Sequence, residues 1–289
     1  MSERVFIVGA GKVGRGLSRA FRASGVAVVG LHARREHDEA TSSGEYPASL
    51  GDANVILIAV RDAEIDGVCA GLAALVRKSP TRIARGTVIL HTSGTAEPQG
   101  YTALRALGFA AGTFHPLIPF ATPERGAQLV RSAWVGIDGD ATACASSRRL
   151  AAAVGARTVN IPAGHKGAYH AAAVMASNFP VVLAGIASQI LAQAGVAERT
   201  AEQVVQSLMA AAVQNLEHGS PAAMLTGPVV RGDVGTVHAH LHALRGQTTA
   251  LEVYDVLTRA ASALLARRAA LVDHAHLGRG REGKDSGGE

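Results

Sequence analysis

The sequence predicts an α/β domain followed by an all-helical domain, and two patterns carry this prediction. Up to about residue 160, short β-branched runs alternate with longer segments of helical periodicity, which is typical of repeated βαβ units around a largely parallel sheet. After Ile161-Pro162 only helical periodicity remains. The 289 residues also exceed the usual length of one compact domain. We therefore expect domains at 1–161 and 162–277, with a Gly-rich, polar, disordered tail at 278–289.

The individual elements follow from the spacing of apolar residues and from the turn residues between them. In the first domain we expect strands at 4–8, 26–31, 54–60, 87–91, 110–114, 133–137 and 156–160. The helices expected between these strands are 12–24, 64–77, 97–107 and 142–154. In the second domain we expect helices at 165–194, 198–217, about 234–244 and 247–275.

Composition and charge argue against several classes of protein. Cys69 and Cys144 lie far apart and outside any CxxC motif, so neither a disulfide framework nor a zinc site is indicated. The N-terminus shows no basic region followed by an apolar run, and no uncharged apolar run of membrane-spanning length stands out elsewhere. The net charge is +5, but the arginines are scattered and form no basic stripe with aromatics. We expect a cytoplasmic protein that binds neither membranes nor nucleic acid.

A glycine-rich turn follows the first expected strand. The apolar residues 5–8 run directly into Gly9-Ala10-Gly11-Lys12-Val13-Gly14, and a helical pattern follows. This strand–turn–helix context is what the dinucleotide-binding fingerprint of a Rossmann domain requires. Gly9 allows the tight turn, Gly11 lets the backbone approach a pyrophosphate, and Gly14 lets the helix pack against the strand. The N–H groups at the helix start can bind phosphate, and we prefer this function to a merely structural turn.

The end of the second expected strand bears on the choice of cofactor. An NAD enzyme usually places Asp or Glu there to bind the ribose hydroxyls, but this segment is Leu31-His32-Ala33-Arg34-Arg35. Two guanidinium groups suit a 2′-phosphate by charge and by geometry. We therefore predict NADP(H) rather than NAD(H), the alternative being that both arginines are solvated loop charges. Glu36 keeps NAD(H) open.

Further cofactor contacts are expected where the next strands end, because ligands of open α/β sheets bind at the carboxyl ends of the strands. Val60 and Arg61 end the third expected strand, and Thr92 and Ser93 follow the fourth. For the last two, a hydrogen-bonded turn with an N-cap is an equally good interpretation.

Candidate groups for chemistry at a carbonyl or imine lie on the first helix of the second domain. Lys166 and His170 are i,i+4 neighbours on one face, and Ser177 and Asn178 lie two to three turns further on. A lysine or histidine can protonate oxygen or nitrogen as hydride arrives at carbon, although solvated residues near a helix end are as common. His115 follows the fifth expected strand. It would either face the ligand site at the carboxyl ends of the strands or be hydrogen-bonded by backbone in a proline turn.

Two other kinds of site are not supported. In the run Val237-His238-Ala239-His240-Leu241-His242, only His238 and His242 would share a helix face, and no third ligand is placed, so we predict no metal site. No GxSxG elbow follows a strand, which argues against a serine hydrolase.

Taken in order, these motifs resemble the 6-phosphogluconate dehydrogenase-like superfamily, and more narrowly the bacterial oxidoreductase-like family that pairs a Rossmann-like domain with the domain of unknown function DUF2520. The narrower resemblance rests on the glycine motif, His91-Thr92-Ser93-Gly94, Phe114-His115-Pro116-Leu117, Tyr169-His170-Ala171-Ala172-Ala173 with Ser177-Asn178, and Leu225-Thr226-Gly227-Pro228 with Arg231-Gly232-Asp233. The resemblance implies an NADP-binding domain and a helical domain that often dimerises, so we expect a homodimer through the helices.

The resemblance also suggests roles for single residues. Lys166 falls where hydroxyacid dehydrogenases of the superfamily carry a catalytic lysine, but their asparagine four residues later is His170 here. This departure leaves an acid–base role open and puts hydroxyacid substrates in doubt. Thr226 falls roughly where pyrroline-carboxylate reductases bind substrate.

The resulting hypothesis is an NADP-dependent oxidoreductase that transfers hydride between nicotinamide and a small carbonyl, imine or alcohol. Lys166 and His170 would polarise or protonate the substrate, Asn178 and Thr226 would orient it, and His115 and Ser177 would complete the substrate site. The alternative is a non-catalytic NADP(H)-binding sensor or scaffold, because a fold and a cofactor site do not guarantee catalysis.

Overall fold

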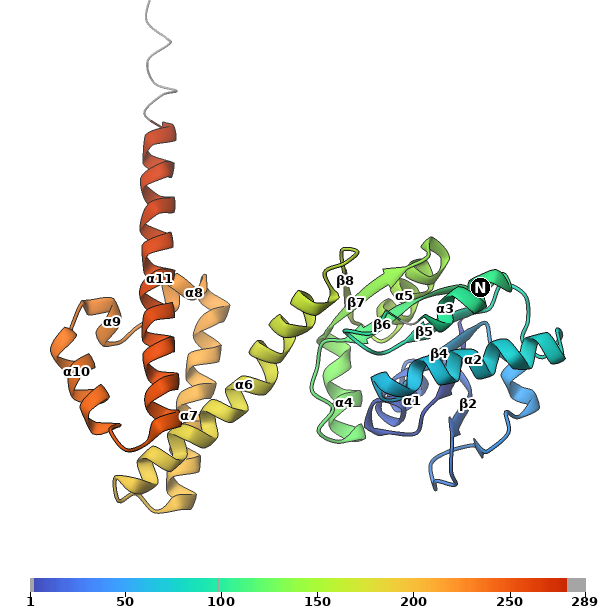
Figure 1. Ribbon diagram of the computed structural model, residues 1–289, viewed down its shortest axis with the longest axis horizontal. Coiled ribbons are helices and arrows are strands. Elements are labelled where there is room, and N and C mark those ends of the chain that lie inside the picture. The colour runs from blue at the N-terminus through green and yellow to red at the C-terminus, as the bar shows by residue number, and fades with distance from the viewer. Residues whose placement is uncertain (1–2, 98, 280–289) are drawn as a thin grey trace, which may run out of the picture. The chain divides into compact units, whose positions relative to one another are not determined.

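The computed structural model describes residues 3–97 and 99–279, and the chain divides into two compact units after Phe179. The first unit holds the sheet, and the described part of the second contains helices only (Figure 1). The last strand ends at Asn160, while the division between units falls inside the long helix α6 (Lys166–Gln193). The predicted class, an α/β domain followed by a helical one, is confirmed.

The sheet has eight strands in the order β3-β2-β1-β4-β5-β6-β7-β8. Their bounds are β1 (Arg4–Val8), β2 (Ala27–Ala33), β3 (Ser42–Ser43), β4 (Val55–Ile58), β5 (Val88–His91), β6 (Ala110–Pro116), β7 (Trp134–Gly139) and β8 (Arg157–Asn160). All neighbouring strands are parallel except β6 and β7. Strands β7 and β8 therefore run the other way, and their carboxyl ends lie at the edge where the other strands begin.

Helices cover both faces of this sheet. Their bounds are α1 (Lys12–Ala23), α2 (Asp62–Lys78), α3 (Gly100–Ala106), α4 (Pro123–Leu129) and α5 (Ala141–Ala153), with 3-10 turns η1 (Ala48–Asp52) and η2 (Val130–Ser132). Successive β1 residues alternate between two cores, with Ile7 packing among residues of α1 and α5 and Phe6 among residues of α2 and α3. Burial on both faces explains why the strands are continuous apolar runs. The sequence did not predict α4 or the two-residue β3.

The second unit consists of the remainder of α6 with α7 (Glu198–Asn215), η3 (Leu216–His218), α8 (Pro221–Met224), α9 (Pro228–Arg231), α10 (Val234–Ala243) and α11 (Thr248–Arg279). Its buried apolar side chains, among those described, are Ala201, Val205, Leu244 and Ala250. Four such residues make a very small core for a unit of this length. Of the predicted disordered tail, 278–279 belong to α11 and the rest lies outside the described residues.

Helix α6 corrects one expectation from the sequence. It is the one helix, among those described, that is long and apolar enough to cross a membrane, with a mean hydropathy of 1.6 over a window of which no part is buried. Residues 167–197 contain no Asp, Glu, Lys or Arg, so the expectation that no such run exists was wrong. Length and composition alone do not distinguish a membrane span from a helix that is covered by protein.

A series of buried polar contacts begins at His91 on β5, whose side chain is fully buried. The backbone N–H of Ser93 donates to His91 Nδ1 at 3.1 Å, so the neutral ring carries its proton on Nε2. That nitrogen lies 3.3 Å from Thr113 Oγ1. The imidazole is therefore fixed in one tautomer by the loop that follows its own strand.

The same series of polar contacts continues to Lys166, the first residue of α6. Lys166 is 5% exposed, and its ammonium donates to Thr113 Oγ1 at 3.1 Å and to Ala96 O at 2.7 Å. It also forms an ion pair with Asp138 Oδ2 at 3.0 Å. All three N–H groups therefore have acceptors, which is what a buried ammonium requires. The chain of contacts joins the loop after β5 to the first residue of α6.

We expect His91 to make the protein less stable as the pH falls from neutral. Burial, and secondarily the charge of Lys166, lowers the pKa of His91 from 6.5 to about 4. The stabilisation is complete above the ordinary pKa and is lost between about pH 6.5 and 4, because only the unfolded chain then takes up the proton. Two to three pKa units correspond to about 3 kcal/mol. Urea unfolding at about pH 7.5 and pH 5 should show a smaller pH dependence in His91→Gln, and an unchanged pH dependence would contradict this assignment.

Candidate functional site

One cavity of about 680 Å³ lies at the carboxyl ends of β1, β2 and β4. Eight of the residues predicted to bind a cofactor line it: Gly9, Ala10, Gly11, His32, Arg34, Arg35, Val60 and Arg61. They come from three strand ends that are far apart in the sequence and adjacent in the sheet. The volume is within the range of ordinary small-molecule sites.

The glycine turn on this cavity has the geometry that a bound pyrophosphate would need. Gly9 has a φ of +118°, and a Cβ placed on it would lie 2.3 Å from Ala59 O. A Cβ on Gly14 would lie 1.8 Å from Gly9 O, whereas one on Gly11 would meet nothing within 4 Å. Gly11 is also the N-cap of α1 and gives no side-chain cap, so the first N–H groups of the helix are open to an anion. The residues therefore fit a dinucleotide.

Two of the three arginines that line the cavity share one carboxylate. Arg34 Nη1 lies 3.1 Å, and Arg61 Nη2 2.9 Å, from Oε1 of Glu64 on the first turn of α2. The hydrogen bond from Arg61 is the main cause that lowers the pKa of Glu64. Both guanidinium groups are largely exposed, so each pair contributes little to stability by itself. Arg35 is also exposed.

Several lining residues were not predicted from the sequence. Tyr46 packs beside His32 with ring centroids 4.7 Å apart, and Glu64, Gly67 and Gly71 come from α2. Tyr46 carries no motif, so nothing in the sequence indicated it. The two glycines were a usable signal, because glycine inside a helix costs about 1 kcal/mol relative to alanine. Their missing side chains leave open space against the helix surface.

The other predicted cofactor residues do not line this cavity. Lys12, Val13 and Gly14 lie on the first turn of α1, behind Gly11. The Ser93 hydroxyl accepts from the backbone N–H groups of Thr95 and Ala96 at 3.2 and 2.9 Å. Thr92 Oγ1 lies 3.5 Å from Ile58 O. Both side chains therefore stabilise the loop after β5, and a role toward a cofactor stays a prediction.

A cluster of two histidines and a tyrosine stands where β6 ends. His115 Nδ1 lies 2.8 Å from the Tyr169 hydroxyl, and the rings of His115 and His170 are 5.8 Å apart. A Cβ on Gly94 would lie 2.7 Å from both His115 Cε1 and His170 Nδ1. Gly94 therefore lies against both rings, and a side chain at this position would collide with them. The His170 Nδ1 atom is buried and has no hydrogen-bond partner among the described residues, so its hydrogen-bonding capacity is unused there.

Burial sets the protonation of His115 and Tyr169 at neutral pH. It is the main cause that lowers the pKa of His115 to about 4, and the neighbouring His170 lowers it further. Burial also raises the pKa of Tyr169 well above its ordinary value. His115 is therefore neutral and Tyr169 protonated, so their contact is a neutral hydrogen bond that orients the imidazole. The sequence did not single out Tyr169 or Gly94 as site residues.

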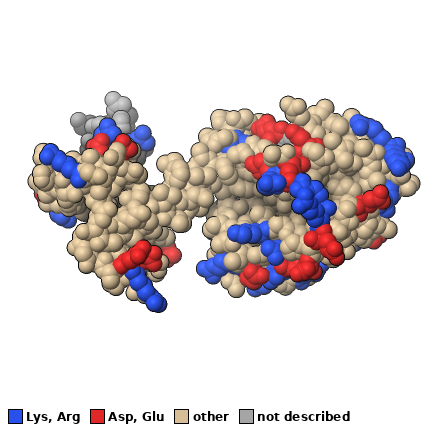
Figure 2. Space-filling view, turned by 60° about the horizontal axis from the view of Figure 1, so that its bottom comes forward, with Lys and Arg blue, Asp and Glu red and all other residues tan. Residues whose placement is uncertain are grey.

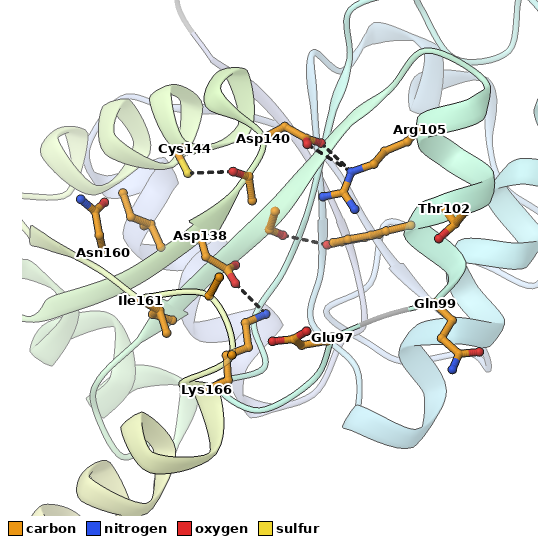
Figure 3. Close-up of a pocket in the computed structure, with 16 residues that line it drawn as sticks. Glu97, Gln99, Thr102, Arg105, Asp138, Asp140, Cys144, Asn160, Ile161 and Lys166 are labelled. Carbon is orange, nitrogen blue, oxygen red and sulfur yellow. Dashed lines mark hydrogen bonds and ion pairs between the residues drawn. The ribbon is translucent and has the colours of Figure 1, made fainter.

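A second cavity, of about 700 Å³, contains Lys166 (Figure 3). The Lys166 ammonium points to Asp138, and the Arg105 guanidinium points to Asp140, 2.9 Å away. The lining comes from α3, from β6 and from the ends of β7 and β8. Lys166 contacts Thr113 in the middle of β6, whereas Tyr169, three residues later, contacts His115 near the end of that strand.

The structure does not assign a contact with the histidine cluster to three of the predicted substrate residues. Asn178 lies eight residues after His170, which is about 12 Å along a helix. The Ser177 hydroxyl is 2.7 Å from Ala173 O and 2.9 Å from Asn178 Oδ1, so it bonds within its own helix. Thr226 belongs to the second unit, between α8 and α9. These three roles stay predictions.

Solved structures of similar fold span nearly the whole chain. A provisionally assigned NADP oxidoreductase from Bacteroides fragilis is 17% identical, with a TM-score of 0.67 over 90% of this chain and 98% of that one. A protein from Thermotoga maritima is 23% identical, with a TM-score of 0.67 over 91% and 99%. Pyrroline carboxylate reductase of Plasmodium falciparum, with NADP bound, is 10% identical, with a TM-score of 0.59 over 91% and 98%. At these identities the likeness shows the fold alone.

Sequence comparison assigns the two parts of the chain. No curated protein matches it. Residues 2–116 match the model of the Rossmann-like domain, and residues 133–261 match the model of the domain of unknown function DUF2520. The chain therefore carries a Rossmann-like domain followed by a DUF2520 domain, which is the pairing that its motifs predicted.

Proposed function

We propose that this protein is an NADP(H)-dependent oxidoreductase. The observation that carries the proposal is the 680 Å³ cavity in which the glycine turn, the open N-terminus of α1 and the Arg34-Arg35 pair meet. Proteins of the same fold support it, because the Plasmodium structure holds NADP and the Bacteroides protein is provisionally assigned as an NADP oxidoreductase.

Residues of the first unit would hold the cofactor by its charges. The N–H groups at the start of α1 would bind the pyrophosphate beside Gly11, where no side chain obstructs the approach. Arg34 and Arg35 would bind the 2′-phosphate, since planar guanidinium groups match its oxygens. When bound, the nicotinamide supplies or accepts a hydride at a substrate carbon.

The histidine cluster would donate the proton that the substrate takes up. As hydride arrives at the carbon of a carbonyl or imine, the oxygen or nitrogen gains negative charge and needs a donor. The unpartnered Nδ1 of His170 lies beside Gly94 and would donate there, while Tyr169 would keep His115 in position. Lys166, whose three N–H groups are already bonded, would position the start of α6. Its contact with substrate stays a prediction.

We further propose that the helical unit pairs with a second copy of the chain in the cytoplasm. Large apolar side chains are exposed on several of its helices, including Val181, Val182, Leu208, Val213, Val234, Val256 and Leu257. Much of the surface of this unit is uncharged on the face that Figure 2 shows. A membrane would cover α6 but not the apolar residues of α7, α10 and α11, whereas a symmetric partner can cover a whole helical face. The two free cysteines agree with a reducing compartment.

Cofactor binding is the first test. We expect NADPH to bind with a dissociation constant well below about a millimolar, the upper end of ordinary enzyme affinities. Arg34→Ala and Arg35→Ala should each weaken NADPH by about tenfold and leave NADH nearly unchanged, because only NADPH carries the 2′-phosphate. Nicotinamide fluorescence measures both. Absence of binding by either nucleotide up to about a millimolar would refute the proposed function.

The histidine cluster is tested by turnover. Small carbonyls and cyclic imines would be screened by oxidation of NADPH, the imines included because of the pyrroline carboxylate reductase fold. With any substrate found, His170→Ala should lower kcat by about a hundredfold or more and leave the NADPH dissociation constant unchanged. His165→Ala, at an exposed histidine just before α6, is the matched control. Equal turnover in His170→Ala and the parent would rule out this role.

The oligomeric state tests the apolar surface. Sedimentation should give a dimer for the parent chain at micromolar concentration. Leu208→Glu should shift it toward monomer, because a charge at a buried interface is costly, whereas Gln203→Glu on the same helix should not. A monomeric parent that floats with lipid vesicles would instead identify α6 as a membrane segment.

A further inference from the structure

Glu64 occupies a position in the cofactor cavity that the proposed function does not explain. It stands on the first turn of α2, and one of its oxygens accepts from both Arg34 and Arg61. We infer that Glu64 competes with the 2′-phosphate of the cofactor for Arg34, and thereby limits how strongly the protein prefers NADPH to NADH. This inference rests on the proposed function.

Solvent exposure distinguishes the inner member of the group formed by Glu64, Arg34 and Arg61. The Glu64 side chain is 29% exposed, against 75% for Arg34 and 81% for Arg61. The carboxylate is thus the inner group, held at the helix start, and the two guanidinium groups reach inward to it from the ends of β2 and β4. A phosphate that bound Arg34 would have to replace this carboxylate or lie close to it.

The negative charge of the Glu64 carboxylate makes it an unfavourable neighbour for a phosphate. Arg34 and Arg61 carry two positive charges and Glu64 removes one of them. A phosphate monoester has a charge of about −1.5 to −2 at neutral pH, so it is repelled by the carboxylate that it meets. Two exposed unit charges a few ångströms apart affect an equilibrium by up to about fivefold. That is the scale of effect expected here.

NADH should respond differently, because it presents ribose hydroxyls where NADPH presents a phosphate. A carboxylate accepts hydrogen bonds from hydroxyls, which is the reason that NAD enzymes place Asp or Glu near the ribose. Replacing Glu64 by glutamine keeps the side-chain shape and an acceptor oxygen while removing the charge. The change should therefore act on the 2′-phosphate and leave the hydroxyl form almost unaffected.

The test uses nucleotides that differ only in this phosphate. The full chain would be titrated with 2′,5′-ADP and with 5′-AMP by calorimetry, and then with NADPH and NADH. In Glu64→Gln we expect 2′,5′-ADP and NADPH to bind about fivefold more tightly, and 5′-AMP and NADH to stay within about twofold. Glu64→Ala should give the same gain for 2′,5′-ADP and NADPH, which guards against an effect of the glutamine itself.

Glu36→Gln is the matched control. Glu36 lines the same cavity and carries the same charge, but no ion pair joins it to an arginine among the described residues. An equal gain in Glu36→Gln would overturn the inference, because it would show a general effect of charge. Unchanged or weaker 2′,5′-ADP binding in Glu64→Gln would overturn it too and would indicate that Glu64 holds Arg34 in place for the phosphate. If the parent chain bound none of the four nucleotides, the proposed function would fail and the inference with it.

Discussion

The buried ammonium of Lys166 fixes where the helical part of the chain begins. An ammonium in the protein interior is stable only when its N–H groups are bonded and its charge is paired, and Asp138, Ala96 O and Thr113 together satisfy it. These three acceptors come from β7, from the loop after β5 and from β6. Removing one partner of such a pair costs about 3–5 kcal/mol, so α6 has one favourable starting point on the sheet.

The position of the histidine cluster follows from that starting point. Because β7 and β8 run opposite to the other strands, α6 starts near the middle of the sheet and its first turn advances toward the edge where β6 ends. Tyr169 and His170 are thereby carried to His115 and Gly94. Lys166 and His170 are four residues apart on one helix, yet the first is fully bonded, whereas Nδ1 of the second has no hydrogen-bond partner in the described part of the chain. The same helix thus supplies a structural anchor and the histidine to which we assign the proton donation.

The two parts of the chain depend on different forces. The sheet buries apolar residues on both faces and needs no other chain for its core. The helical unit buries few of its described side chains and exposes many large apolar ones, so burial of apolar surface, the main favourable term in folding, is left largely unrealised within it. Stability of this unit is therefore tied to whatever covers it.

The amino-acid sequence by itself determined the fold class, the glycine turn and the arginines after β2, because each is a local pattern. Strand periodicity, the spacing of glycines and the residues at a strand end are all contiguous in the chain. It did not determine that Tyr46 and Glu64 share a cavity with Arg34, or that Gly94 separates His115 from His170. Those neighbours lie 12 or more residues apart, and only the strand order and the reversal of β7 bring them together. The structure also decided that Lys166 is buried and paired, since its acceptors depend on packing that no local pattern records.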